Sequence, residues 1–336
     1  MKWSVLDQSP ASAGSGEDRA IRDSIALAQD CDRLGYERFW LSEHHNASSV
    51  VGTAPEVLAA AIAATTRRIR VGSAGVMLPH YSALKVAEQF RVLEAIAPGR
   101  IDLGVGRAPG SDGLTARALN PIGDAEAFPR QVQELDHWIS DIKLPEGHPY
   151  RSIAAHPRGA TRPELWILGS SGYGAQLAAY LGLSYAFAYF FSDGAGVEEA
   201  LALYRNSFRP SERLARPHAT ICVWAVAADT TAEAMRLLTA REHWRVGFEK
   251  GLRRPLISPE DAAAYSYTPA EQASIERVRS TALAGTAEHV ADGLRALARR
   301  LELDEMVINT WTFDPAARRR SYELLAATLD LPGVRS

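Results

Sequence analysis

The chain has 336 residues, a hydrophobic content of 46% and a formal net charge of -3. That length is normal for a single α/β barrel, and the hydrophobic share is typical of a globular protein with a large core. No basic stretch stands clear of acidic neighbours, which argues against nucleic acid or another polyanion as a partner.

The cysteines and the N-terminus bear on the compartment. Cys31 and Cys222 lie far apart in the chain and give little support for a disulfide framework. Cys31 also falls on the apolar stripe of a helical pattern, so we expect it in the core. The N-terminal residues lack the apolar core of a signal peptide, and no apolar run reaches membrane-spanning length. We therefore expect a cytoplasmic protein with no membrane partner.

Strand-like apolar runs alternate along the chain with stretches of helical spacing. Strands are predicted at 3–6, 38–42, 69–79, 101–105, 165–169, 184–189, 220–227 and 306–310. Helices are predicted at 17–34, 53–65, 82–96, 175–181, 196–208, 231–248, 269–283, 285–300 and 315–329. Such alternation indicates parallel strands joined by right-handed crossovers. Eight strands in one chain of this size favour a (β/α)8 TIM barrel over a Rossmann sheet, as a single domain over 1–336 with insertion loops at its C-terminal face.

The segment 250–269, which contains Tyr265 and Tyr267, interrupts this alternation. It is either a lid over the cavity of the barrel or a disordered surface loop. Aromatic residues near strand ends, namely Phe187, Tyr189, Phe190 and Trp224, either line an aromatic-friendly pocket or belong to the core.

Glu43, His44, His45 and Asn46 follow the second predicted strand directly. Successive strand residues point to opposite faces, so at most one of the two histidines faces the central cavity, and the other is held by its surroundings. A neutral imidazole exchanges a proton near neutral pH, and a nearby carboxylate fixes its tautomer. A polar cap on the strand end remains open as an alternative. A metal site is disfavoured because adjacent histidines rarely chelate one ion and no cluster with ligand spacing follows.

Two further features lie late in a predicted strand or directly after one, toward the end where barrel enzymes carry their function. The centre of the third strand is made of tiny residues, including Ala74 and Gly75, which indicates either a ligand close to the backbone or close packing of the barrel wall. The run 170–174, Ser-Ser-Gly-Tyr-Gly, lies between a strand and a helix, and Arg107 follows the adjoining strand. Backbone N–H groups at a helix start and a guanidinium together bind phosphate. A plain strand–helix turn and a structural ion pair for Arg107 are the alternatives.

Taken in order, these motifs resemble the bacterial luciferase-like flavin monooxygenases. The similarity is carried by Glu43-His44-His45 and by the runs 71–79 and 99–107, and it continues through 169–171 and 285–286, so it covers most of the chain. It is greatest to the stand-alone, single-subunit branch. The resemblance implies a (β/α)8 barrel, usually a homodimer, that takes reduced FMN from a separate flavin reductase.

The resemblance also implies roles for individual residues. Arg107, Ser170 and Ser171 would hold the FMN phosphate with help from Tyr173, and Ala74–Gly75 matches a non-proline cis peptide under the flavin ring. His44 matches the catalytic histidine of the family. Glu43 is expected with it as a catalytic residue, and Glu43 or Asn46 is expected to orient its ring.

There are two departures from the family pattern. Gly106 stands where the light-emitting luciferase subunit has a cysteine, so light emission is not expected, and Gly174 replaces a phosphate-binding threonine. The implied reaction is a two-component monooxygenation, in which reduced FMN and O2 hydroxylate, epoxidise or Baeyer–Villiger oxidise a small organic substrate, for example an aromatic polyketide intermediate. The alternatives are an F420-dependent hydride transferase and a non-catalytic flavin-binding subunit.

Overall fold

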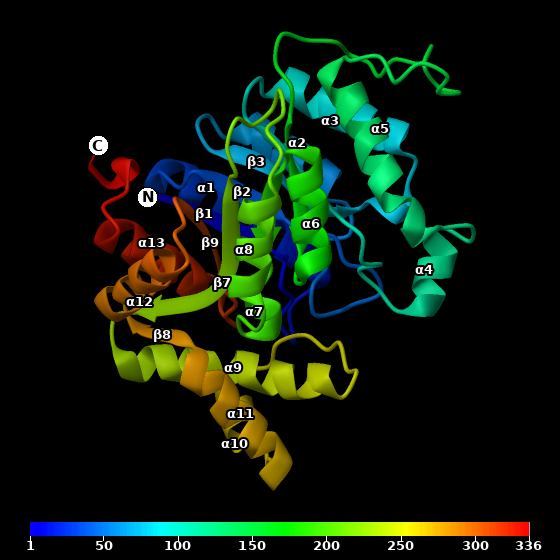
Figure 1. The fold of residues 1–336 in the computed structure, drawn as a ribbon. Coiled ribbons are helices and arrows are strands. Elements are labelled where there is room, and N and C mark those ends of the chain that lie inside the picture. The colour runs from blue at the N-terminus through cyan, green and yellow to red at the C-terminus, as the bar shows by residue number, and fades with distance from the viewer. Residues whose placement is uncertain (336) are drawn as a thin grey trace.

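Parallel strands close into a barrel that is surrounded by helices (Figure 1). The computed structural model describes residues 1–335. The strands follow one another around the sheet in the order β6-β5-β4-β3-β2-β1-β9-β7, and pairing of β6 with β7 closes the ring. The predicted (β/α)8 barrel is therefore confirmed.

The predicted strands are all present, with ends that differ by a few residues. The strands of the barrel are β1 (Lys2–Asp7), β2 (Arg38–Leu41), β3 (Arg70–Met77), β4 (Ile101–Gly106), β5 (Glu164–Gly169), β6 (Ser184–Phe187), β7 (Ala219–Ala228) and β9 (Glu305–Asn309). A further strand, β8 (Leu283–Thr286), lies outside the ring and pairs with the outer half of β7, from Ala225 to Ala228.

The sequence pattern predicts a helix start at Gly285, and this prediction is wrong. β7 pairs with β9 only through Cys222–Trp224, so the edge of its outer half is left for another strand. The helix instead begins at Ala287, where the hydroxyl of Thr286 accepts the His289 N–H as an N-cap.

The helices between the strands fall mostly where the sequence predicts them. They are α1 (Glu17–Leu34), α2 (Pro55–Thr65), α3 (Ala83–Ile96), α5 (Phe128–Ser140), α6 (Gly172–Leu181), α8 (Val197–Ser207), α9 (Thr231–Glu249), α11 (Pro269–Thr281), α12 (Ala287–Arg300) and α13 (Pro315–Thr328). Shorter turns are α4 (Gly113–Leu119), α7 (Tyr189–Ser192), α10 (Pro259–Ala264), η1 (Leu78–His80), η2 (Ala125–Ala127) and η3 (Pro332–Arg335). The sequence pattern predicts no element for the stretch that holds α4 and α5. No helix within residues 1–335 is long and apolar enough to cross a membrane.

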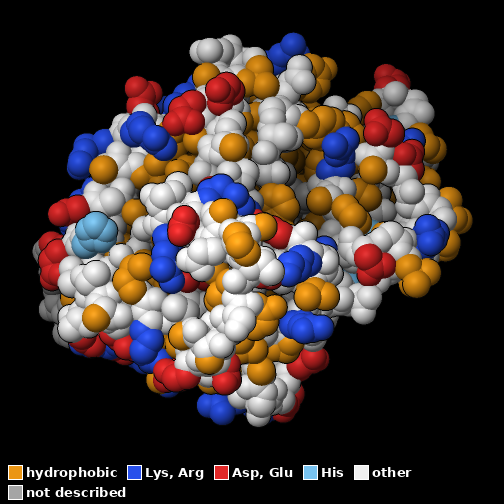
Figure 2. Space-filling model, turned by 90° about the horizontal axis from the view of Figure 1, so that it is seen from below, with side chains coloured by type: hydrophobic (Ala, Val, Ile, Leu, Met, Phe, Trp, Pro, Cys, Tyr) orange, Lys and Arg blue, Asp and Glu red, His pale blue; other side chains and the backbone are white. Residues whose placement is uncertain are grey.

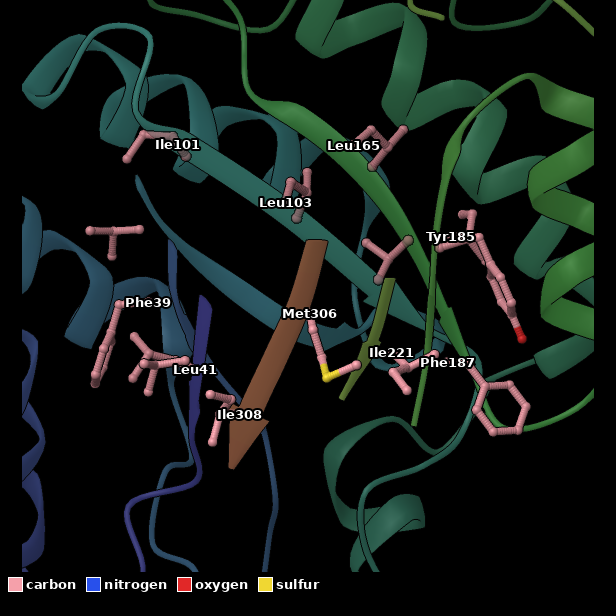
Figure 3. Packing of buried hydrophobic residues seen from close by; sticks show 14 of the residues in the cluster. Phe39, Leu41, Ile101, Leu103, Leu165, Tyr185, Phe187, Ile221, Met306 and Ile308 are labelled. Atoms are coloured by element: carbon pink, nitrogen blue, oxygen red, sulfur yellow. The ribbon is translucent and has the colours of Figure 1, made fainter. Parts of the chain in front are cut away.

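The main hydrophobic core lies between the outer face of the barrel and the helices. Strand side chains such as Phe39, Leu103 and Ile308 pack there (Figure 3). Cys31 is fully buried in this layer, which confirms its predicted place. Phe187 is also fully buried there, so it does not line a pocket.

The inside of the barrel is closed at the amino ends of the strands by a buried charge network. Arg38, 2% exposed, donates from Nη1 to both oxygens of Asp102, at 2.9 and 2.8 Å, and from Nε to Glu305 Oε1 at 2.8 Å. The indole of Trp40, one layer further along the barrel, donates to Asp102 at 2.8 Å. Because these groups fill the interior at the amino end, a ligand can enter the interior of the barrel only from the carboxyl end.

The segment 250–269 is part of the folded structure and contains α10, which packs against α9. The N–H of Leu256 donates to the carbonyl of Ala11, and its carbonyl accepts the N–H of Ala13, so the segment is fastened to the loop after β1. In Figure 1, α9, α10 and α11 lie together below the barrel. The alternative of a disordered surface loop does not fit these bonds, and the role of a lid stays a prediction.

Candidate active site

His44 faces the inside of the barrel because the alternation of β2 continues beyond its last residue. Arg38, Trp40, Ser42 and His44 fall two residues apart, on one face. The Nδ1 atom of His44 lies 3.1 Å from the hydroxyl of Ser42, and its backbone N–H donates to the Gly52 carbonyl at 3.0 Å. Burial, the charge of Arg253 and the neighbouring His45 together lower the pKa of His44 to about 4. The ring is therefore neutral at neutral pH.

His45 and Glu43 occupy the opposite face, as the alternation predicts. The carboxylate of Glu43 is buried, and its Oε1 accepts from His45 Nε2 at 2.7 Å and from the Tyr81 hydroxyl at 2.6 Å. Its Oε2 accepts the backbone N–H of Met77 at 3.1 Å. These bonds tie the loop after β2 to the end of β3.

The expectation that Glu43 or Asn46 orients His44 is wrong. Glu43 is one residue from His44, so the strand period turns it away, and Asn46 donates to Asp112 Oδ2 at 3.0 Å instead. Ser42 is the partner of His44. Ser42 lies two residues before His44, so the same strand period that turns one histidine inward also places Ser42 on the face of His44. The place of Glu43 among the catalytic residues stays a prediction.

The peptide bond between Ala74 and Gly75 is cis, as the family resemblance implies. A Cβ on Gly75 would lie 2.4 Å from Leu168 Cδ1 and 2.6 Å from the Gly104 carbonyl oxygen, so packing of β3 on its neighbours requires glycine there. Ala74 and Leu168 are only partly buried and pack on the inner cluster around Trp40. This part of the open end is therefore apolar and closely packed.

Arg107 and the start of α6 form the candidate phosphate site. The Arg107 guanidinium lies over the ring of Tyr173, with Cζ 4.0 Å from the ring centroid. Ser171 is the N-cap of α6, but its side chain makes no capping hydrogen bond, and both Ser170 and Ser171 are exposed. The carboxylate of Glu126 lies 3.9 Å from Arg107 and is 87% exposed. This loose contact does not amount to a structural ion pair, and the hydroxyls, the helix start and the guanidinium fit a phosphate group.

The two glycines that depart from the family pattern differ in the room around them. A Cβ on Gly174 would lie 3.3 Å from the Tyr185 ring and 3.4 Å from the Leu168 carbonyl oxygen, which leaves little space for a larger residue. A Cβ on Gly106 would meet only Met77 Sδ, at 3.6 Å.

The remaining predicted aromatic residues differ in position. Phe190 is partly buried and packs on the inner cluster of the barrel, near its open end. Tyr189 packs against the main core, and Trp224 is buried under the Arg241 guanidinium, 4.3 Å from its ring centroid. Phe190 therefore is the one of these three that fits the lining of a pocket.

Arg253 is a site residue that the sequence pattern does not indicate. It belongs to the segment 250–269, yet its carbonyl accepts the Ser48 hydroxyl at 2.8 Å, so it reaches the loop that carries His44. Its guanidinium lies 5.0 Å from the ring centroid of Phe248. A cavity of about 570 Å³ is bordered by Arg253, Asn46 and Ser48. This contact depends on a pairing of distant segments, for which a single sequence carries no signal.

The end of the molecule where α4, α7 and α9 lie is turned toward the viewer in Figure 2, and apolar side chains are exposed there between separate charged groups. A closed (β/α)8 barrel with its candidate site residues at the carboxyl ends of its strands is the architecture of an enzyme. The family model described as luciferase-like monooxygenase matches residues 1–304. The chain therefore belongs to the luciferase-like monooxygenase family and is a flavin-dependent monooxygenase.

Similar proteins extend over nearly the whole chain. An uncharacterized protein of Bacillus subtilis, YwcH, is 43% identical over 96% of this chain and 97% of its own length. An N-acetyl-S-alkylcysteine monooxygenase of the same organism is 38% identical over 97% of each chain. The crystal structure of apo-MsnO8 superposes with a TM-score of 0.88 at 34% identity, covering 98% of both chains.

Two more distant structures share the fold alone. The oxygenating constituent of 3,6-diketocamphane monooxygenase from Pseudomonas putida, solved in complex with FMN, has a TM-score of 0.71 at 18% identity over 99% of this chain and 98% of its own. An F420-dependent secondary alcohol dehydrogenase has a TM-score of 0.67 at 12% identity over 97% and 98%. The same barrel thus holds either cofactor, and the residues of this chain must decide between them.

Proposed function

We propose that this chain is the oxygenase of a two-component system, which takes reduced FMN from a separate flavin reductase and transfers one atom of O2 to a small organic substrate. The observation that carries the proposal is the Arg107 guanidinium, which lies over Tyr173 at the uncapped start of α6. FMN ends in a single phosphate, and this cluster has the charge and the N–H donors that a single phosphate needs. When bound, reduced FMN supplies the activation of O2.

The residues of the chain then have three tasks. Arg107, Ser170 and Ser171 hold the phosphate, and the apolar wall at Ala74–Gly75 supports the ring system. His44 holds or moves a proton at Nε2, because Ser42 occupies its other nitrogen. If Nδ1 donates to Ser42, then Nε2 is an acceptor, and if Ser42 donates to Nδ1, then Nε2 carries the proton. Both tautomers are neutral, so the ring either accepts a proton at Nε2 or donates the one that it carries there.

Exclusion of water is assigned to the segment 250–269. It is fastened to the loop after β1 through Leu256 and to the loop after β2 through Arg253, so it lies beside two of the loops that form the open end. An oxidising site that is closed to water avoids wasteful decay of its reactive species. We propose that this segment is the lid that closes the site.

The substrate is proposed as an apolar or aromatic molecule, with an aromatic polyketide intermediate as one class. The support is the partly exposed Phe190 and Leu168 at the open end of the barrel. The relative named for N-acetyl-S-alkylcysteines adds a second class, the thioethers. Hydroxylation, epoxidation and Baeyer–Villiger oxidation suit the first class, and sulfur oxygenation suits the second.

We also propose a homodimer that works in the cytoplasm with a transiently bound reductase. The alanine-rich α2 and the neighbouring α3 leave Val57 66% exposed, Val92 48% and Ile96 47%. Exposed apolar side chains on two adjacent helices favour contact with another chain. Light scattering on purified protein would give twice the monomer mass, and a monomer at micromolar concentration would remove the dimer from the proposal.

The decisive experiment compares cofactors and one variant. Purified protein is mixed with reduced FMN or with reduced F420, then with O2 and a panel of aromatic and thioether substrates, while O2 uptake and products are measured. We expect substrate-dependent O2 uptake with FMN only, and His44→Ala should remove product formation while FMN binding is retained. Hydride transfer with F420 and no O2 uptake would show the alternative reaction, and FMN binding without any turnover would show a non-catalytic flavin-binding subunit.

A further inference from the structure

The amino end of the barrel, opposite the candidate active site, carries a cavity of about 340 Å³. It lies between the end of α5, helix α3 and the starts of β3 and β5. The stretch 141–163, which covers it, is a long connection without helix or strand, and such connections in compact domains commonly have a function. The charged residues of its lining are Arg70, Arg91, Asp141, Arg162 and Glu164.

Arg91 is the unusual member of this lining. It is 4% exposed, and its bonds all go to neutral carbonyl groups: Nε to Pro157 at 2.7 Å, and Nη1 to Ile139 at 2.8 Å and to Trp138 at 3.3 Å. Its Nη2 atom is buried and has no hydrogen-bond partner within the described chain. Burial lowers the pKa of Arg91, as expected when a charge is kept away from water. The charge of Asp141, a carboxylate of the lining, opposes this shift. A buried guanidinium without a bonded counter-ion is costly, so Arg91 lacks a directly bonded anion.

The carboxylates of the lining are paired with arginines other than Arg91. Glu164 Oε2 pairs with Arg38 at 2.9 Å, and Glu164 Oε1 with Arg70 at 3.2 Å. Asp141 pairs with Arg158 at 2.9 Å. Within residues 1–335, Arg91 and Arg162 have no carboxylate within 4 Å, and Arg162 is held by a weak bond to the Glu212 carbonyl at 3.4 Å. The lining thus has two guanidinium groups without counter-ions.

We propose that this cavity is a binding site for a small oxyanion, held between Arg91 and Arg162. Phosphate, sulfate and the carboxylate of a small organic acid share the required chemistry, because each presents paired oxygens to a guanidinium. The volume also accommodates such an ion with bound water. Because α3, α5 and the 141–163 stretch all meet here, a bound anion stabilises this end of the barrel. The inference is independent of the proposed function, since the two sites lie at opposite ends of the barrel.

The test is a calorimetric titration with inorganic phosphate at constant ionic strength. The protein is the full chain with Arg107→Gln, so that phosphate does not bind at the candidate flavin site. We expect one saturable site per chain. The added substitution Arg162→Gln should raise the dissociation constant for phosphate about tenfold or more, as loss of a charged hydrogen bond does. Arg162 is chosen because Arg91 also binds the last carbonyls of α5, so that its loss would disturb folding.

The matched control is Arg130→Gln, which removes the same charge from an exposed side chain of α5 outside the lining. It should leave phosphate affinity unchanged within about twofold. Succinate titrated in parallel distinguishes the source of the anion: tighter binding of succinate indicates an organic acid, and tighter binding of phosphate an inorganic ion. Absence of saturable binding, or equal weakening by Arg130→Gln and Arg162→Gln, would overturn the inference.

Discussion

The neutral state of His44 can be measured through the pH dependence of stability. The pKa of His44 in the folded protein is about 4, against an ordinary value of 6.5. Because the folded pKa lies below the unfolded one, the unfolded chain binds the proton first, and stability is lost as the pH falls from about 6.5 toward 4. For a single group with these values the loss is about 2 kcal/mol at pH 5 and close to zero at pH 7.5.

The assay compares urea unfolding of the wild type and His44→Gln at pH 7.5 and pH 5. Glutamine does not titrate, so between these two pH values the variant should lose about 2 kcal/mol less than the wild type. His137→Gln, on the exposed side of α5, is the control and should follow the wild type. If the wild type and His44→Gln lose stability in parallel, within about 0.5 kcal/mol, then His44 is not buried in its neutral form and the reasoning fails.

Three further predictions concern arginines. Arg253→Gln should raise the pKa of His44, seen by NMR titration of its ring protons, because the guanidinium charge holds that pKa down; an unchanged midpoint would contradict this. Arg107→Gln should weaken binding of reduced FMN, in an anaerobic titration, about tenfold or more, whereas the exposed Arg130→Gln should have no effect. Arg38→Met should lower the free energy of unfolding by about 3–5 kcal/mol, because Asp102 and Glu305 lose a buried counter-ion; a loss below about 1 kcal/mol would show that the network contributes little.

The sequence predicts the barrel well because its signals are local. Each strand of the ring is a short apolar run that is followed by a helical pattern, and both can be read within a window of a few residues. The division between His44 and His45 follows from the strand period alone, and the same period, applied one step back, places Ser42 on the face of His44, a contact that the sequence analysis missed. Glu43 illustrates a mistaken choice of partner: its position next to His44 in sequence places it on the opposite face.

The features that the sequence does not predict depend on contacts between distant segments. β8 exists because the outer half of β7 has a free edge, and nothing in Leu283–Thr286 itself distinguishes a strand from the start of a helix. Arg253 reaches the histidine loop through the fold of the segment 250–269. The charge network had a visible signal, since Arg38, Asp102 and Glu305 are charged residues at or near the starts of predicted strands, where burial requires a partner.

That network also explains how His44 is positioned. One face of the second strand carries Arg38 in the closed end of the barrel, then Trp40, then Ser42 and His44 at the open end. Arg38 and Trp40 are both hydrogen-bonded across the barrel interior to Asp102 of β4, two strands away in the sheet, at 2.8 Å in each case. A shift of this strand by one residue would break both bonds and turn every one of these side chains to the other face, with His44 leaving the interior. The ion network at one end of the barrel therefore determines the register that brings the imidazole to the other.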